Sequence, residues 1–328
     1  MTLLASVEER FLVPAYASRL AEAWIATHGA LALPFQLRGE VRRSVVATEG
    51  GSLRVLEIGR KKHLTPFRQK LLGPVTQEHD DGTLTLTSPA ALDAVSADLT
   101  LVEIHRWMAP RFRRAGWIVV PADVRWQGDL SNLPPRRPTV SLKSDLAKVR
   151  RHDYTLEHAT DSGDWDEFYH GMVVPQARAR FGDDVWIPSE RLQRVLSVRG
   201  RLHFIRRGGV RVAGVCSVRD GASLWLPLMG LRQGDQSLLR EGVYSAAFSL
   251  VFAWAREMGC QRVDMGRTSP FVHDGIQRFK RKWGLQPAAD PLSHLIAVRA
   301  GQSVRPMFER QPVLIETARG IATYPEAA

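Results

Sequence analysis

The sequence contains very little cysteine. Only Cys216 and Cys260 occur among its 328 residues, far apart and without CxxC spacing. This scarcity argues against a disulfide framework and against a zinc site built on thiolates. We expect both cysteines to be small buried hydrophobic residues.

Long apolar runs are also missing. The chain has no stretch of about eighteen apolar residues, the length that crosses a bilayer. Its first residues, MTLLASVEERFL, carry acids where a signal peptide has a basic start. We therefore expect a cytoplasmic protein without a transmembrane segment.

Familiar catalytic signatures do not occur. The sequence has no G-x-S-x-G elbow, P-loop, HExxH or G-x-G-x-x-G motif. Its ten histidines show no metal-ligand spacing, so we expect no metal site and no bound cofactor. His170 and His273 could act as bases, although a lone histidine is more often structural or exposed.

Positive charge is what the sequence has in excess. Lys and Arg number 45 against 34 Asp and Glu, which gives a formal net charge of +11. Such an excess favours a polyanionic partner: nucleic acid, an anionic membrane or a phosphate-bearing substrate. The charge alone does not choose among these three.

The length favours two domains. The clearest punctuation is NLPPRRPT, whose three prolines and two arginines are typical of an extended, solvated connection. We expect a first domain over 1–133, a linker over 134–140 and a second domain over 141–328.

The first half alternates between helix-like and strand-like patterns. We expect helices over about 15–28 and 90–115, and strands over 43–48, 52–59 and 116–126, with a less clear strand in GTLTLT. This alternation indicates an α/β or α+β fold, with mixed central sheets flanked by helices.

The second half is more regular. We expect one helix capped by Ser141 or Ser144, one kinked or divided at Pro175 and one capped by Ser189. Three strands joined by Gly-containing turns follow, then an apolar helix that ends at Gly259. In chain order, the expected strands cover 154–159, 201–207, 210–220, 223–230, 260–266 and 294–300.

Three stretches resemble the Fem-type (FemABX-like) branch of the GNAT superfamily and the related BioF2-like acyltransferases. They are DLSNLPPRRPTVSLKSDLAKVRRHDYTLEHA, AAFSLVFAWAREMGCQRVDMGRT and GIQRFKRKWG, and the resemblance covers about residues 125–298. It implies two GNAT-like lobes, the second well formed and the first diverged. It also implies amide-bond formation, in which an amine attacks an acyl donor: aminoacyl-tRNA in Fem enzymes, an acyl thioester in other branches.

The last stretch predicts a short helix with two unlike faces. At 100° per residue, one inward stripe forms; it contains Ile276, Phe279, Lys280 and Trp283. Three cations face the opposite side: Arg278, Arg281 and Lys282. One lysine therefore points into the protein.

The inward lysine is the candidate for chemistry. The resemblance gives Lys280 the role of the lysine in the Fem "FK" pair, with Phe279 as its packing neighbour. A cation in a dry site stabilises the oxyanion of acyl transfer. The structural alternatives are that Lys280 reaches the surface or pairs with Asp264. Asp264 itself could orient Arg267 or accept from the incoming amine, or could simply stabilise a turn.

Substrate contacts are predicted at four residues, two of which lie around the start of the apolar helix. The loop LLREGVYSA departs from the Q/R-x-x-G-x-G/A pattern with which ordinary GNAT enzymes hold pyrophosphate. This argues against conventional acetyl-CoA binding. The candidate substrate-binding residues are Arg240, Tyr244, Arg267 and Trp283, although core packing is an alternative for Tyr244.

Phosphate contacts are predicted at the outward cations of the last helix and at the basic helix of the second domain. The candidates for tRNA or phosphate binding are Arg278, Arg281, Lys282, Arg150 and Arg151, and the clusters at 60–62 and 111–114 could join them. Each cluster alone could be a solvated face. Asp274 is expected to cap the last helix.

The leading hypothesis is a Fem-like N-acyltransferase that moves an aminoacyl group from aminoacyl-tRNA to an amine of a small molecule or peptide. A second hypothesis is an N-acyltransferase that uses acyl-CoA or an acyl carrier protein. A third is an inactive GNAT fold that binds RNA or a membrane. The acceptor amine and the oligomeric state stay open.

Overall fold

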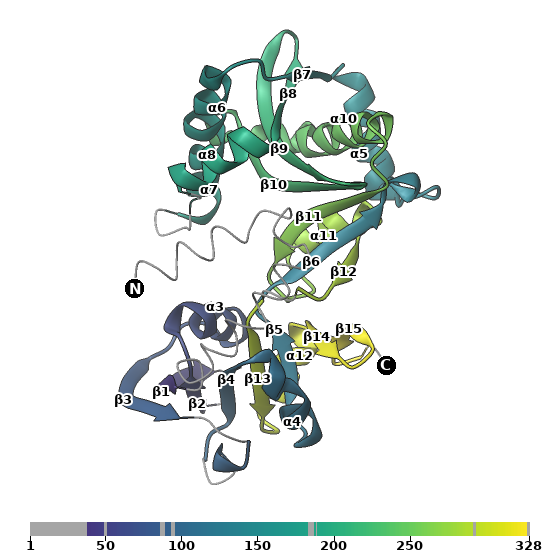
Figure 1. Cartoon of the computed structure of the whole chain (residues 1–328). Coiled ribbons are helices and arrows are strands. Elements are labelled where there is room, and N and C mark those ends of the chain that lie inside the picture. The colour runs from purple at the N-terminus through teal and green to yellow at the C-terminus, as the bar shows by residue number, and fades with distance from the viewer. Residues whose placement is uncertain are drawn as a thin grey trace. The chain divides into compact units, whose positions relative to one another are not determined.

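In a computed structural model of the chain, the described residues are 38–48, 51–85, 89–92, 96–182, 187, 189–290 and 293–326. The helix expected over 15–28 lies outside them. The chain forms two compact units, each built on a mixed β-sheet flanked by helices (Figure 1). The α+β fold predicted from the sequence is therefore confirmed.

The two units divide the chain differently from the prediction. One, here called the central unit, consists in its described part of Trp126–Gly266 and Phe279–Gln286. The flanking unit consists of the described residues before Trp126, together with Arg267–Arg278 and the chain from Pro287 onward. The proline-rich segment 134–140 thus lies within the central unit, because proline marks extended backbone and not the edge of a core.

Strand pairing explains this division. The last predicted strand, β13 (Leu295–Ala300), pairs antiparallel with β4 (Leu99–Ile104) on one side and with β5 (Ile118–Pro121) on the other. The end of the chain therefore belongs to the sheet of the first half. Hydrogen bonding between strands decides which unit a segment joins, and the sequence order does not reveal these partners.

The central unit is built on a seven-stranded sheet in the order β12-β6-β11-β10-β9-β8-β7. Three predicted strands form an antiparallel meander at its middle, joined by turns with left-handed glycines. The strands are β6 (Val124–Asp129), β7 (Thr155–His158), β8 (Arg201–Arg207), β9 (Val210–Asp220), β10 (Ser223–Leu231), β11 (Arg262–Thr268) and β12 (Gln286–Ala288).

Helices cover both faces of this sheet (Figure 1). One face carries α6, a single π-helical segment, α7 and α8, and the other carries α5 and α10. The helices of this unit are α5 (Val140–Arg151), α6 (Ser162–Phe168), α7 (Val174–Phe181), α8 (Glu190–Arg199), α9 (Ser237–Arg240) and α10 (Val243–Glu257). The unit also contains the end of α11 (Gly275–Lys282), whose residues up to Arg278 belong to the flanking unit. The π-helical segment Tyr169–Val173 divides the helix just before Pro175, as expected.

The helix caps agree with the sequence except in one case. Ser189 caps α8, and Gly259 has a φ of 78° just after α10, as predicted. The cap of α5 is Thr139, whose hydroxyl accepts from the N–H of Leu142, and not Ser141 or Ser144. Thr139 follows Pro138 and has the extended backbone that an N-cap requires.

The flanking unit is built on a six-stranded sheet in the order β3-β1-β2-β4-β13-β5, beside the hairpin β14–β15. Its other strands are β1 (Arg38–Thr48), β2 (Gly51–Ile58), β3 (Gln77–Thr85), β14 (Val313–Thr317) and β15 (Gly320–Tyr324). Its α-helices are α3 (Lys61–Leu72), α4 (Ala109–Arg114) and α12 (Arg305–Arg310).

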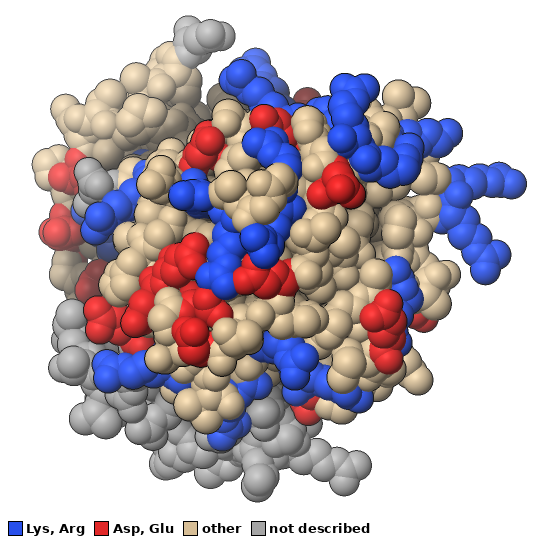
Figure 2. Space-filling view, turned by 90° about the horizontal axis from the view of Figure 1, so that it is seen from above, with Lys and Arg blue, Asp and Glu red and all other residues tan. Residues whose placement is uncertain are grey.

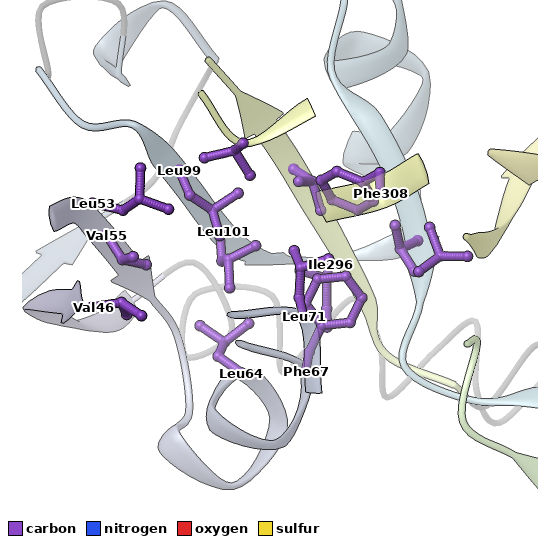
Figure 3. Packing of buried hydrophobic residues seen from close by; sticks show 14 of the residues in the cluster. Val46, Leu53, Val55, Leu64, Phe67, Leu71, Leu99, Leu101, Ile296 and Phe308 are labelled. Carbon is purple, nitrogen blue, oxygen red and sulfur yellow. The ribbon is translucent and has the colours of Figure 1, made fainter. Parts of the chain in front are cut away.

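Two hydrophobic layers cover the two faces of this sheet. Alternate residues of β4 point to opposite faces: Leu99 and Leu101 join one cluster, Val102 and Ile104 the other. The first cluster contains Phe67 from α3 among others, and is drawn in Figure 3. The sheet is thus buried on both sides, which explains why its middle strands read as continuous apolar runs.

Two predictions in this unit are wrong. The helix expected over 90–115 is instead a short 3-10 helix (Pro89–Leu92), β4 and α4. The LTLVEI segment is buried along its length as a strand, and this tertiary pairing overrides its helix-like pattern. The strand expected over 116–126 is two strands, β5 and β6, which belong to different sheets.

The central unit contains a fully buried histidine. His203 on β8 is fully buried, and its Nε2 lies 2.7 Å from the Ser217 hydroxyl. Its Nδ1 lies 3.0 Å from Nδ1 of His158. Burial lowers the pKa of His203 to about 3, helped by the nearby charges of His158 and Arg201.

We predict that the central unit loses stability as the pH falls below the unfolded-state histidine pKa of about 6.5. Between this value and the folded-state pKa of about 3, the unfolded chain binds the extra proton, so stability decreases with falling pH. His203 alone should lower the free energy of unfolding by about 2 kcal/mol between pH 7 and pH 5. Urea titrations of the wild type, His203→Gln and the exposed control His170→Gln measure this. An equal pH dependence in all three proteins would contradict the assignment.

Candidate functional site

The strands β10 and β11 pair over a short distance only. Over the described residues, their parallel ladder consists of three pairs and ends at Trp225 opposite Asp264. Both strands continue beyond this point, and β10 changes its register with β9 between Trp225 and Leu228. The carboxyl end of β11 is therefore a place where a ligand crevice is expected in an open sheet.

Lys280 lies at this end of β11. Its side chain comes from α11 and is buried, with only 5% of the residue exposed. Its ammonium donates to the carbonyl of Gly266 over 3.2 Å. The inward position predicted for this lysine is therefore confirmed, and its charge sits inside the protein.

Asp264 holds the same glycine from the other side. One carboxylate oxygen accepts from the N–H of Gly266 at 2.8 Å, and the other accepts from the side-chain amide of Gln127 at 3.2 Å. Gly266 has a φ of 70°, a conformation that suits glycine. Asp264 therefore stabilises a turn, which was the structural alternative, and it does so beside Lys280.

Gln127 and Gly266 were not among the site residues predicted from the sequence. The D-x-G spacing of Asp264 and Gly266 is a signal for such a turn. Nothing in the sequence around Gln127 indicates its partner, because β6 and β11 become neighbours only through the sheet.

Aromatic residues pack beside the lysine. Phe279 is half-buried, with its ring 5.2 Å from that of Phe248 and 6.2 Å from that of Tyr244, centre to centre. The hydroxyl of Tyr244 accepts from the Gln176 amide at 3.1 Å, and burial raises its pKa. Trp283 is fully buried against Phe248, so it packs in the core instead of contacting a substrate as predicted.

The predicted stripe of α11 is rotated slightly. Its buried residues are Gln277, Lys280 and Trp283, whereas Ile276 and Phe279 are half-buried. The amide of Gln277 donates to the carbonyl of Ser269, which turns this polar side chain inward. The N-cap prediction for α11 is confirmed, because Asp274 accepts from the N–H groups of Ile276 and Gln277.

Arg267 belongs to the flanking unit. Its guanidinium forms an ion pair with Asp290, which is fully buried. Asp123 is close to both, and burial raises its pKa against the opposing effect of the Arg267 charge. Asp290 is thus an acidic partner of Arg267 that the sequence did not indicate.

The predicted phosphate-binding residues differ in exposure. Arg278 and Arg281 are exposed, as are Arg150, Arg151 and Arg240. Lys282 is different: it is paired with Asp145, and its side chain is only 18% exposed. Its charge is therefore neutralised within the protein, which contradicts the outward position predicted for it.

Acidic side chains are interspersed with the basic ones. On the face of the molecule in Figure 2, Lys and Arg alternate with groups of Asp and Glu. The excess positive charge on the face shown in Figure 2 is thus not one continuous patch. A separate contact involves α11, where the guanidinium of Arg281 lies 6.0 Å from the centre of the Trp126 ring.

A carboxylate lies beside the first turn of α10. The N-cap is Gly242, with a φ of 86°. Two residues into the helix, the Ser245 hydroxyl donates to Asp145 at 3.2 Å. Asp145 thus contacts the first turn of α10 while it is paired with Lys282.

One group of metal-ligating side chains occurs among the described residues. His63, Glu103 and His294 of the flanking unit place one ligand atom each within 4.8 Å of one another. These residues are far apart in the sequence, which is why no metal-ligand spacing was visible. In the part of the chain that is described, no helix has the length and apolar character needed to cross a membrane.

Comparison with known proteins gives structural matches only. No protein-family model matches the chain, and no match was found among curated proteins. The chain is similar in structure to L-PGS from Bacillus licheniformis, with 13% identity, a TM-score of 0.42, and coverage of 78% of this chain and 84% of that one.

Two further matches have similar values. The C-terminal domain of a putative lysylphosphatidylglycerol synthetase from Agrobacterium fabrum is 12% identical, with a TM-score of 0.40 and coverage of 78% and 83%. FemX is 10% identical, with a TM-score of 0.41 and coverage of 83% and 90%.

We predict that Asp264→Ala destabilises the central unit. The change leaves the Gly266 N–H and the Gln127 amide without this acceptor, which should cost about 1–3 kcal/mol. Asp264→Asn keeps an oxygen that can accept from Gly266, so its loss should be smaller. Urea denaturation measures both, with the exposed Asp220→Ala as control. Equal losses in the Ala and Asn variants would show that the oxygen does not hold the turn.

Proposed function

We propose that the protein is a Fem-like N-acyltransferase. It would transfer an aminoacyl group from aminoacyl-tRNA to an amine of a small molecule or peptide. The observation that carries this proposal is the buried ammonium of Lys280, directed at Gly266 where β10 and β11 cease to pair. The motif resemblance of the same helix adds the reaction class.

The proposed reaction needs one stabilised negative charge. The neutral amine attacks the carbonyl carbon of the aminoacyl ester, and a tetrahedral intermediate with an oxyanion forms. The attack forms a C–N bond, which the product keeps as its amide. The ester C–O bond then breaks, and the ribose oxygen leaves with a proton that originates from the amine. Lys280 would stabilise the oxyanion, since a charge in a dry site acts more strongly than in water.

The remaining site residues would support this lysine. Asp264 and Gln127 fix the turn at Gly266, and so fix the carbonyl to which the ammonium donates. Phe279 and Tyr244 provide half-buried aromatic surface beside it. In this proposal Asp264 is a positioning residue and not the acceptor of the amine proton.

The loop before α10 favours RNA over coenzyme A as the carrier. Its sequence LLREGVYSA departs from the Q/R-x-x-G-x-G/A pattern with which ordinary GNAT enzymes hold pyrophosphate. Exposed Arg278 and Arg281 on α11, and Arg150 and Arg151 at the end of α5, offer separate contacts for a longer phosphate backbone. Lys282 is not included, because Asp145 neutralises it.

The donor can be tested directly. We expect the protein to transfer radiolabelled amino acids from a mixture of charged tRNAs to members of a panel of amines and peptides. The same panel is offered aminoacyl and fatty-acyl thioesters of coenzyme A. Transfer from thioesters without any transfer from charged tRNA would replace the proposal by the thioester-dependent alternative. Binding of tRNA without transfer from either donor would favour a non-catalytic RNA-binding module.

We predict that Lys280→Ala lowers kcat by about 100- to 1,000-fold, the effect of removing one oxyanion donor. Binding of tRNA, measured by filter retention, should change little. Lys143→Ala, which removes an exposed lysine of α5, serves as the matched control. Unchanged turnover in a folded Lys280→Ala protein would remove this residue from the site.

A further inference from the structure

Three side chains that ligate metals converge in the flanking unit. His63 comes from the first turn of α3, Glu103 from the end of β4, and His294 from the position before β13. Nδ1 of His63 lies 2.9 Å and Nδ1 of His294 lies 3.4 Å from the same oxygen, Oε1 of Glu103. The two imidazole rings are stacked with their centres 4.1 Å apart.

These separations fit a small, closely coordinated cation. Zinc binds imidazole nitrogen and carboxylate oxygen at about 2.0–2.2 Å, so neighbouring ligand atoms in a tetrahedron lie about 3.4 Å apart. The two distances to Glu103 are close to this value, and the stacked imidazole rings must turn before both nitrogen lone pairs face one ion. Two imidazoles and one carboxylate suit zinc and similar transition metals better than magnesium or calcium.

The carboxylate is oriented by the backbone. Oε2 of Glu103 accepts from the N–H of Arg60 at 2.9 Å, which leaves Oε1 turned toward the two histidines. Gly59 allows this close approach, because a side chain there would collide with Glu103. Such hydrogen bonds to the second oxygen are typical of metal-ligating carboxylates.

A cation already occupies this position. The guanidinium of Arg60 forms an ion pair with Glu103, and its Nη2 lies 2.9 Å from Nδ1 of His294. The Arg60 side chain is 42% exposed, so it has room to swing into solvent. The backbone N–H of Arg60, which orients the carboxylate, would stay in place.

We propose that His63, Glu103 and His294 form a binding site for one divalent transition-metal ion, with zinc as the best match, and that the Arg60 guanidinium competes with the metal for this site. Three protein ligands leave one coordination position for water. The site is independent of Lys280 and of the proposed transfer reaction.

The test uses the full chain without a polyhistidine tag, freed of metal by a chelator and titrated with Zn²⁺ in a calorimeter. Titration with Co²⁺ reports ligand geometry through its visible absorption. We expect one ion per chain, and a loss of affinity of more than about 100-fold in His63→Ala and His294→Ala. Exposed His79→Ala is the matched histidine control and should bind like the wild type.

Arg60→Ala gives the decisive result. Removing the competing guanidinium should tighten Zn²⁺ binding at least about tenfold, since the backbone still orients the carboxylate. Thermal melting with and without Zn²⁺ checks that each variant folds, and a metal-dependent rise in Tm counts as binding. The proposal is overturned if neither the wild type nor Arg60→Ala binds, or if binding survives in His63→Ala and His294→Ala.

Discussion

The central unit depends on a charge held out of water. Lys280 is the lysine of α11 that points inward, and burying an ammonium costs several kcal/mol unless it finds a partner. The carbonyl of Gly266 accepts from it, and Asp264 fixes that glycine by accepting from its N–H. Lys280 thus connects α11 with the turn at Gly266, and its ammonium lies near the place where β10 and β11 stop pairing.

The distribution of the other charges follows the same rule. A net charge of +11 suggests a surface open to polyanions, but several cations are committed to acids within the fold. Lys282 pairs with Asp145, Arg60 with Glu103, and Arg211 with three acids. Among the described residues, some cations expected at the surface are therefore committed to ion pairs, whereas Arg278 and Arg281 on α11 and Arg150 and Arg151 on α5 stay exposed.

The two sites illustrate different kinds of convergence. In the central unit, a lysine and an aspartate meet at one glycine, and the motifs that contain them are close in the sequence. In the flanking unit, His63, Glu103 and His294 come from a helix, a strand end and a loop that are distant in the sequence. Their shared oxygen is brought to them by the pairing of β4 with β13, so both sites are consequences of sheet order.

The sequence by itself determined much of the central unit. Its periodicity gave the strands β8, β9 and β10 and the apolar helix α10. Helical spacing also placed Lys280 on the inward side of α11. These features depend on contacts over a few residues, for which hydrophobic period and capping are sufficient.

Tertiary structure alone decided the rest. It placed β13 in the sheet of the first half and made β4 a strand. It also paired Lys282 with Asp145 and Arg267 with Asp290. It also brought His63, Glu103 and His294 together. Strand pairing and buried ion pairs join residues that are distant in the chain, and no local pattern specifies which partners will meet once the sheets have formed.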